Sequence, residues 1–260
     1  MQKWFNNVAL SLIGCIVFTI SLMAGSAAQA ASVATSEKRP VVVELFTSQG
    51  CNSCPPAEAF LNKLAKRDNI IALEFHVDYW DYIGWQDPFA HKDFTNRQRA
   101  YAGPLQMRYV YTPQMVLNGE RHEVGSRVMS VEVAIDQMMS RSASPPAPPL
   151  PLVKIKHEAN ILSVDIQSNG VTVDEEYDIL IVSFDGQHET KVTRGENRGK
   201  TLINSNIVRD IHNLGIWKGG DKSLSVDIYS LAGNGGCAVL LQKKNGGAIL
   251  TAAMLSLEPS

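Results

Sequence analysis

Cys51 and Cys54, separated by two residues, are the side chains in this sequence best suited to carry out a reaction. A cysteine thiolate is a nucleophile, and two thiols at this spacing can form a disulfide or exchange one with a substrate. Zinc binding would need a second close pair of Cys or His residues, which the sequence lacks. A structural disulfide is the other alternative. The spacing favours redox chemistry.

The segments around the cysteines predict how they are positioned. Residues 41–46 form an apolar, β-branched run typical of a buried strand, and the polar turn 47–50 leads directly to Cys51. Pro55 and Pro56 suit the first turn of a helix, and residues 70–77 predict a second buried strand, parallel to the first. A strand–turn–helix arrangement places Cys51 at the positive end of the helix dipole, which favours the thiolate.

Residues 1–30 predict a cleaved signal peptide. Lys3 precedes an apolar run over residues 8–24, and Ala28-Gln29-Ala30 matches the small-residue cleavage pattern. An uncleaved membrane anchor or lipidation at Cys15 are the alternatives. Cleavage would give a periplasmic or secreted protein with no stable membrane span. Three cysteines would remain, so at most one intramolecular disulfide can form.

The rest of the first half predicts further elements of a mixed sheet. Asp87 can cap a helix that starts at Pro88 and runs to about residue 102. Asn118-Gly119 predicts a tight hairpin between strands 114–117 and 120–124, and a helix follows over residues 127–141. The predicted order over residues 31–143 is therefore β-α-β-α-β-β-α.

This order, with CxxC before the first helix and Thr112-Pro113 before the third strand, resembles the thioredoxin fold. The longer motifs resemble a family of exported, thioredoxin-like bacterial proteins known as DUF1223. The motifs that carry the resemblance are SQGCNSCPPAE, HVDYWDYIGWQDPF, RQRAY, YTPQMVLNG and GENRGKTL.

The resemblance implies roles for individual residues. Cys51 corresponds to the attacking cysteine and Cys54 to the resolving one. Pro113 corresponds to a cis-proline facing them, and Thr112 would offer its backbone to a substrate. Glu44 corresponds to a buried carboxylate that takes protons from the resolving cysteine, although a solvent-facing strand position is equally compatible with its spacing. Asn52-Ser53 differs from the usual inner dipeptides, so no redox potential is implied.

An aromatic segment follows the second strand, at the same sheet edge as the cysteines. Its residues Trp80 and Trp85 predict a substrate-binding surface there, because α/β sheets bind ligands at the carboxyl ends of their strands. A packed loop is the alternative. His76, at the end of the strand, is expected either in this surface or as a buried strand-end histidine.

The second half predicts a β-rich region. A Pro-rich linker over residues 144–151 separates it from the first half. Short strand-like runs over residues 152–260 favour an all-β sandwich-like domain, although residues 200–214 are compatible with helix or strand. Strands 237–243 and 248–254 predict a hairpin with Cys237 as a buried, small apolar residue.

These observations predict an exported thiol–disulfide oxidoreductase without an organic cofactor or a metal, acting on protein thiols or disulfides. The alternatives are a Cu(I)-binding module and a non-catalytic docking module on the same scaffold. The formal net charge of −2 and the lack of a basic stripe argue against nucleic-acid binding. No motif for serine hydrolysis or phosphate binding is present. Neither direction of electron flow nor oligomeric state follows from the sequence.

Overall fold

Two β-branched, apolar runs form the centre of a mixed sheet in the computed structural model, which describes residues 31–143 and 149–257. β2 (Val41–Thr47) and β3 (Ile70–His76) are buried along their whole length and lie parallel. The helix α1 (Pro55–Leu64) connects them. The predicted signal peptide lies outside the described residues.

From β2 onward, the first half follows the predicted order β-α-β-α-β-β-α. A further strand that the sequence did not predict, β1 (Ser32–Thr35), precedes β2. The Asn118-Gly119 hairpin is confirmed, since both residues have the positive φ angles, 46° and 63°, that a tight turn between strands requires. The elements are η1 (Asp78–Ile83), α2 (Lys92–Ala100), β4 (Gln114–Leu117), β5 (Arg121–Val124) and α3 (Val128–Ala143).

The start of α2 differs from the prediction. The helix begins at Lys92, with His91 at its N-cap, rather than at Pro88. Asp87 caps only a turn before the helix, since its Oδ1 accepts a 3.0 Å hydrogen bond from the backbone N–H of Phe89. Its Oδ2 accepts hydrogen bonds from His76 and from the backbone N–H of Gln49, both 2.7 Å away. The same carboxylate therefore serves a local turn and a tertiary contact.

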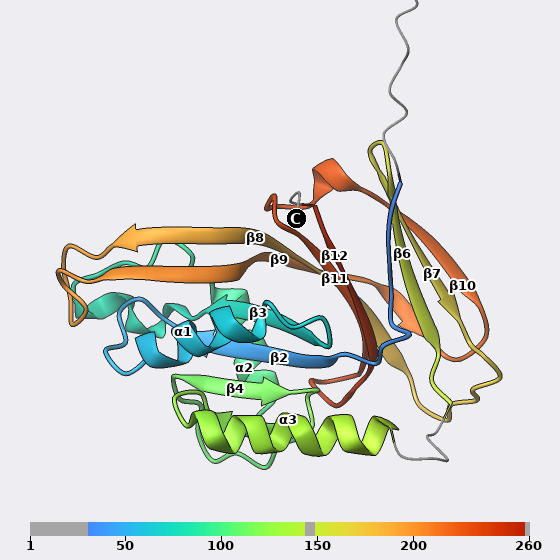
Figure 1. Cartoon of the computed structure of the whole chain (residues 1–260), viewed down its shortest axis with the longest axis horizontal. Coiled ribbons are helices and arrows are strands. Elements are labelled where there is room, and N and C mark those ends of the chain that lie inside the picture. The colour runs from blue at the N-terminus through green and yellow to red at the C-terminus, as the bar shows by residue number, and fades with distance from the viewer. Residues whose placement is uncertain (1–30, 144–148, 258–260) are drawn as a thin grey trace, which may run out of the picture.

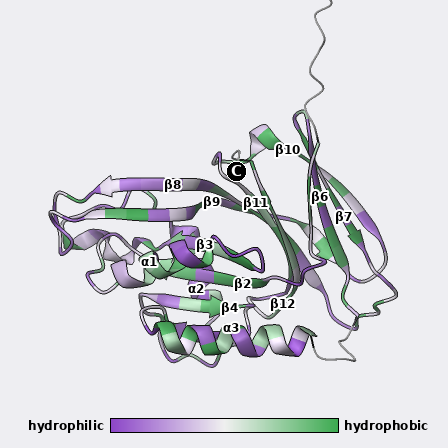
Figure 2. Ribbon diagram, in the orientation of Figure 1, coloured by the Kyte–Doolittle hydropathy of each residue, from purple (hydrophilic) through white to green (hydrophobic). Residues whose placement is uncertain are grey.

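The helices cover both faces of the sheet. α1 and α3 pack on Val41, Val43 and Leu45 of β2. α2 lies on the opposite face, where Phe94 packs near Phe46 and Phe75. Figure 2 shows alternating hydrophobic and hydrophilic bands along α3, as expected for a helix with one buried face.

The sheet continues into the second half of the chain. The added strands are β8 (Tyr177–Lys191), β9 (Thr201–Trp217), β11 (Gly236–Lys243) and β12 (Ile249–Ser256). The strand order is β12-β11-β8-β9-β3-β2-β4-β5, and β9 joins β3 through a parallel pair at Ile207 and Glu74. The segment 200–214, compatible with helix or strand from the sequence, thus lies in a strand from residue 201 on.

A second, four-stranded sheet packs on this extension (Figure 1). Its order is β1-β6-β7-β10, built from β1 (Ser32–Thr35), β6 (Leu152–Glu158), β7 (Ile161–Gln167) and β10 (Lys222–Asp227). Cys237 is buried between the sheets, as predicted for a small apolar residue. The molecule is therefore mixed α/β with a β-rich region, and one layer of that region belongs to the same sheet as β2 and β3.

None of the helices in the described ranges has the length and apolar character needed to cross a membrane.

Candidate functional site

Cys51 and Cys54 form a disulfide at the N-terminal end of α1, with their Cα atoms 5.5 Å apart. Cys54 is the N-cap, and its carbonyl accepts hydrogen bonds from Ala57 N and Glu58 N at 2.9 and 3.1 Å. Pro55 and Pro56 have no N–H to donate. The helix dipole therefore points at the disulfide, but the polar contact of the Cys51 sulfur is the Ser53 hydroxyl, 3.4 Å away.

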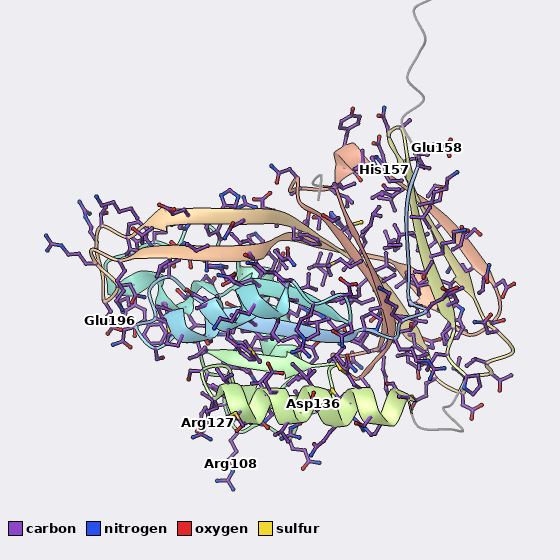
Figure 3. All side chains as sticks on the ribbon, viewed as in Figure 1. Arg108, Arg127, Asp136, His157, Glu158 and Glu196 are labelled. Carbon is purple, nitrogen blue, oxygen red and sulfur yellow. A yellow bond between two sulfur atoms is a disulfide. The ribbon has the colours of Figure 1, made fainter. Side chains whose placement is uncertain are left out.

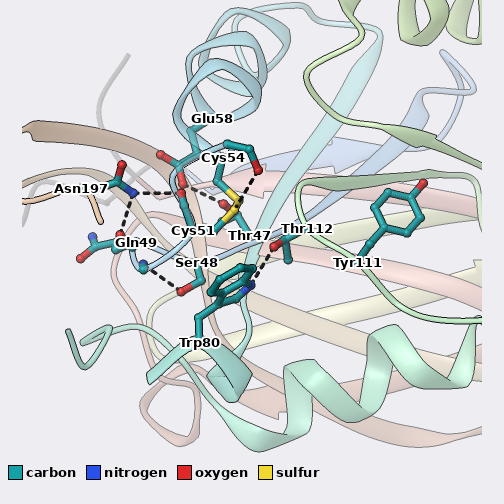
Figure 4. Close-up of a disulfide and its surroundings, with 12 residues drawn as sticks. Thr47, Ser48, Gln49, Cys51, Cys54, Glu58, Trp80, Tyr111, Thr112 and Asn197 are labelled. Atoms are coloured by element: carbon teal, nitrogen blue, oxygen red, sulfur yellow. Dashed lines mark hydrogen bonds between the residues drawn. A yellow bond between two sulfur atoms is a disulfide. The ribbon is translucent and has the colours of Figure 1, made fainter. Parts of the chain in front are cut away.

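Two other predicted site residues, Trp80 and Thr112, lie in the surroundings of this disulfide (Figure 4). The Thr112–Pro113 peptide bond is cis, as the resemblance implied, and Pro113 is buried. Trp80 donates a 2.8 Å hydrogen bond from Nε1 to the Thr112 hydroxyl. Trp85 donates from Nε1 to Oε1 of Gln49, at 3.2 Å. Both tryptophans are partly buried, so they form a wall of the site rather than a free surface.

Glu44 is placed away from this site, which corrects the expected role in proton transfer to Cys54. Its carboxylate accepts a 2.7 Å hydrogen bond from Nε of Arg97 and a further one from the Tyr101 hydroxyl. Alternation along β2 puts Glu44 on the same face as Phe46, against α2, whereas α1 packs on the opposite face through Leu45. The carboxylate therefore neutralises a buried arginine.

A different buried carboxylate lies next to the disulfide. Glu58 follows Cys54 by one helical turn, and Figure 4 shows its side chain beside the cysteines. Thr47 donates a 2.7 Å hydrogen bond to its Oε1, while Oε2 accepts none from any described residue. Burial raises the pKa of Glu58, although the positive charge of His76 partly opposes the shift.

Glu58 interacts electrostatically with His76 and Asp87 in a buried polar cluster. His76 Nδ1 lies 2.7 Å from the Asp87 carboxylate, and His76 Nε2 lies 3.8 Å from Glu74. Asn204 on β9 donates a 2.8 Å hydrogen bond to Glu74. His76 is fully buried, so it is the strand-end histidine of the two alternatives and not part of an open surface.

The charges in this cluster shift one another. Burial alone would lower the pKa of His76, but the Asp87 carboxylate raises it to about 9. Burial raises the pKa of Glu74 to about 8, against the opposing effect of His76. The pKa of Asp87 is lowered despite its burial, because His76 stabilises the carboxylate. His76 and Asp87 thus form a buried ion pair at neutral pH.

Asn197, from the connection between β8 and β9, completes the site. Its Nδ2 donates hydrogen bonds to the carbonyl oxygens of Gln49 and Cys51, both at 2.9 Å (Figure 4). Sequence reasoning missed Asn197, Glu58, Glu74 and Asp87. The available signal was their position in or beside the motifs that carried the family resemblance, since spacing alone does not bring them together.

A metal site of three or more His, Cys, Asp or Glu ligands is not formed by the part of the chain that the structure describes. Beside the disulfide, the polar side chains form hydrogen bonds with one another and with the backbone instead. What the arrangement offers chemically is a disulfide, a helix N-terminus and a nearby buried carboxylate.

Comparison with known proteins identifies relatives of this arrangement. The family model described as "Protein of unknown function (DUF1223)" matches residues 42–242. A crystal structure of a protein from Agrobacterium tumefaciens, a structural genomics target, superposes with a TM-score of 0.70 and 31% sequence identity. That match covers 85% of this chain and 95% of the other. No curated protein gives a significant match. The chain belongs to the DUF1223 family.

Proposed function

We propose that this protein is a thiol–disulfide oxidoreductase with a thioredoxin-like active site, cycling the Cys51–Cys54 pair. The observation that carries the proposal is the placement of this disulfide at the start of α1, in the same site as the cis Thr112–Pro113 bond. The polar and aromatic residues around it are buried or partly buried, so the pair is held in a built site.

The exchange proceeds in two balanced steps. In the reduced protein, the Cys51 thiolate attacks one sulfur of a substrate disulfide. A Cys51–substrate bond forms, the substrate disulfide breaks, and one substrate thiolate leaves. Cys54 then loses its proton and attacks the Cys51 sulfur, which releases the second substrate thiolate. The substrate gains two electrons while Cys51 and Cys54 are oxidised to the disulfide. The reverse steps oxidise a substrate dithiol.

Stabilisation of the Cys51 thiolate is assigned to two groups. The dipole of α1 favours negative charge at its N-terminus. The Ser53 hydroxyl, 3.4 Å from the Cys51 sulfur, can donate a hydrogen bond to it. The backbone contributes fewer donors than usual at a helix start, because two prolines follow Cys54 and its own carbonyl occupies the next two N–H groups.

Glu58 is assigned the proton-accepting role first expected of Glu44. A buried carboxylate with a raised pKa is a better base for a thiol than an ordinary one, since its proton affinity is closer to that of the thiol. Glu58 also has one carboxylate oxygen that accepts no hydrogen bond within the described residues. Glu44 is excluded from this role by its bonds to Arg97 and Tyr101.

The proposed compartment is extracytoplasmic, either the periplasm or the medium. The signal-like pattern of residues 1–30 and a closed disulfide both support an oxidising environment. The proposed substrates are proteins with thiols or disulfides in that compartment.

Substrate trapping tests the proposal. Cys54→Ser expressed with the full signal region should accumulate mixed disulfides through Cys51, visible on non-reducing gels and lost on reduction. Cys51→Ser is the matched control and should accumulate none. If Cys54→Ser traps no more than Cys51→Ser, exchange at this site is contradicted. Copper bound to the reduced protein at about one ion per chain would then favour Cu(I) binding through two thiolates.

A further inference from the structure

Neither sulfur of the disulfide is open to solvent, since Cys51 and Cys54 are both 0% exposed. Thiol–disulfide exchange requires an incoming thiolate to contact one of the two sulfurs directly. Some part of the covering structure must therefore move before exchange begins. A loop from the second half of the chain holds the backbone on both sides of Gly50, next to Cys51.

Residues 192–200, which we term the cap, connect β8 to β9 and form a closed loop. Val192 N donates to the Lys200 carbonyl at 3.0 Å, and Gly199 N donates to the Val192 carbonyl at 2.8 Å. Within the cap, only Val192 and Asn197 are buried; the other residues are exposed or partly exposed. Glu196, for example, lies at the outer edge of the molecule (Figure 3). The cap is thus held to the site by a small number of inward contacts.

Asn197 makes the polar contacts between the cap and the cysteine loop. Its two amide hydrogens reach the carbonyls of Gln49 and Cys51, which flank Gly50. Its Oδ1 accepts a 2.8 Å hydrogen bond from Lys200 Nζ. An asparagine can donate two hydrogen bonds and accept another at once, whereas an ionised aspartate cannot donate. The residue type is therefore matched to holding two carbonyls.

Gly195 makes a close contact on the other side of the cap. A Cβ atom at this position would lie 3.0 Å from Cβ of Trp85, and the residue has a φ of +71°. The cap backbone thus sits directly on the aromatic segment whose Trp85 bonds Gln49. If Asn197 lost its hydrogen bonds to Gln49 and Cys51, the cap would separate from the cysteine loop but stay in contact with Trp85 through Gly195.

We propose that Asn197 is a positioning residue that latches the cap to the cysteine loop, and that this latch sets how fast a thiol reaches the buried Cys51–Cys54 disulfide. Breaking the two hydrogen bonds that the Asn197 amide donates frees the cysteine loop from the cap without removing any reacting atom. The role of this latch as a gate for substrates rests on the proposed function, although the accessibility of the disulfide can be measured without any substrate.

The test is the rate at which excess dithiothreitol reduces the disulfide of the folded, full-length protein, followed by alkylation of the released thiols. One dithiothreitol thiolate attacks a cysteine sulfur and displaces the other, and its second thiol then closes the dithiothreitol ring, so the reagent is oxidised as the pair is reduced. Asn197→Ala should accelerate reduction about 5- to 100-fold, as expected for losing two hydrogen bonds from a closed state. Lys200→Met, which removes an exposed partner of the latch, should accelerate it about 2- to 10-fold.

Gln242→Ala is the matched control for general loss of stability. Gln242 is also a buried amide, and its Nε2 donates to the Tyr101 hydroxyl and the Gly247 carbonyl, with no contact to the cysteine loop. It should leave the reduction rate within about twofold of the wild type, because Gln242 shares no hydrogen-bond partner with Asn197.

The outcomes separate the two proposals. A wild-type reduction rate in folded Asn197→Ala and in Lys200→Met overturns the latch, even if Cys54→Ser traps substrates. Equal acceleration in Gln242→Ala also overturns it. If trapping fails but Asn197→Ala is accelerated alone, the latch stands and the oxidoreductase proposal falls.

Discussion

The hydroxyl of Thr47 donates a 2.7 Å hydrogen bond to Oε1 of Glu58, and so joins the last residue of β2 to the first turn of α1. The bond holds the Glu58 carboxylate beneath the helix that carries Cys54. It also lowers the pKa of Glu58, against the larger effect of burial, which raises it. The protonation of this carboxylate is thus set by the same elements that position the disulfide.

Glu58→Gln should slow the step in which Cys54 displaces a bound thiol from Cys51. Glutamine keeps an oxygen for the Thr47 bond but cannot take a proton. We expect a loss of about 10-fold or more near neutral pH, in keeping with general base catalysis. Rapid-mixing kinetics of thiol release from a preformed Cys51 mixed disulfide measure the step.

Thr47→Val is the companion variant for that experiment. It leaves the carboxylate in place but removes the hydrogen bond that lowers its pKa, so the rate-against-pH profile should shift to higher pH. An unchanged rate and profile in Glu58→Gln would show that another group, or water, takes the proton.

Glu44→Gln should destabilise the fold without altering exchange. The Arg97 side chain is only 9% exposed, and Glu44→Gln removes the carboxylate that balances its positive charge. Removing one partner of a buried ion pair costs about 3–5 kcal/mol. The free energy of unfolding in urea measures the loss, and the reduction rate of the folded fraction should stay at the wild-type value.

Glu120→Gln provides the comparison for Glu44→Gln. Glu120 pairs with Arg141 at the surface, 3.1 Å away, and solvent screens both groups. Its replacement should change stability by about 1 kcal/mol or less. If Glu44→Gln is no more destabilising than Glu120→Gln but slows exchange, Glu44 takes part in proton transfer after all.

The free energy of unfolding should fall as the pH rises from about 5 to about 9. Glu74 and His76 both have folded-state pKa values raised above their ordinary values of 4.5 and 6.5, to about 8 and about 9. The folded protein therefore binds more protons than the unfolded chain between these values. Stability from Glu74 is full below its ordinary pKa and lost towards pH 8; stability from His76 is lost towards pH 9.

Glu74→Gln isolates one of the two groups. A glutamine does not titrate, so the slope of unfolding free energy against pH should flatten between about pH 5 and 8, by up to about 1.4 kcal/mol per pH unit. A slope due to His76 should remain, because Asp87, rather than Glu74, is the main group that raises the pKa of His76. Urea titrations at a series of pH values give both slopes, and identical slopes in the variant and the wild type would contradict the assignment.

Local patterns were sufficient for much of the first half. Apolar runs placed β2 and β3, and Asn118-Gly119 placed the β4–β5 hairpin, because strand burial and tight turns are set by residues close in sequence. The cis Thr112–Pro113 bond followed from the family resemblance. These features position the cysteines, so the location of the site was predictable.

The hydrogen-bond and ion-pair partners of the buried charged side chains were not predictable from the sequence. Alternation along β2 put Glu44 on the face of Phe46, but nothing in the sequence showed that Arg97 covers that face. Asn197 and Cys51 are 146 residues apart, and Asn204 and Glu74 are 130 apart. Buried and exposed residues do not alternate regularly along β9. Its start contacts α1 at Ile203, whereas its last residue, Trp217, packs between the two sheets. Long-range pairing of this kind leaves no periodic trace.

The parallel pairing of β9 with β3 has a consequence for how the site comes into being. A fragment ending at residue 143 would leave β3 as an open edge strand, and Glu74 would lose the donors that Asn204 and Ser205 supply. Contacts between residues so distant in sequence form slowly, because a long loop must close first. The complete disulfide site therefore requires the chain from β2 through the end of β9, and its assembly depends on closing that long loop.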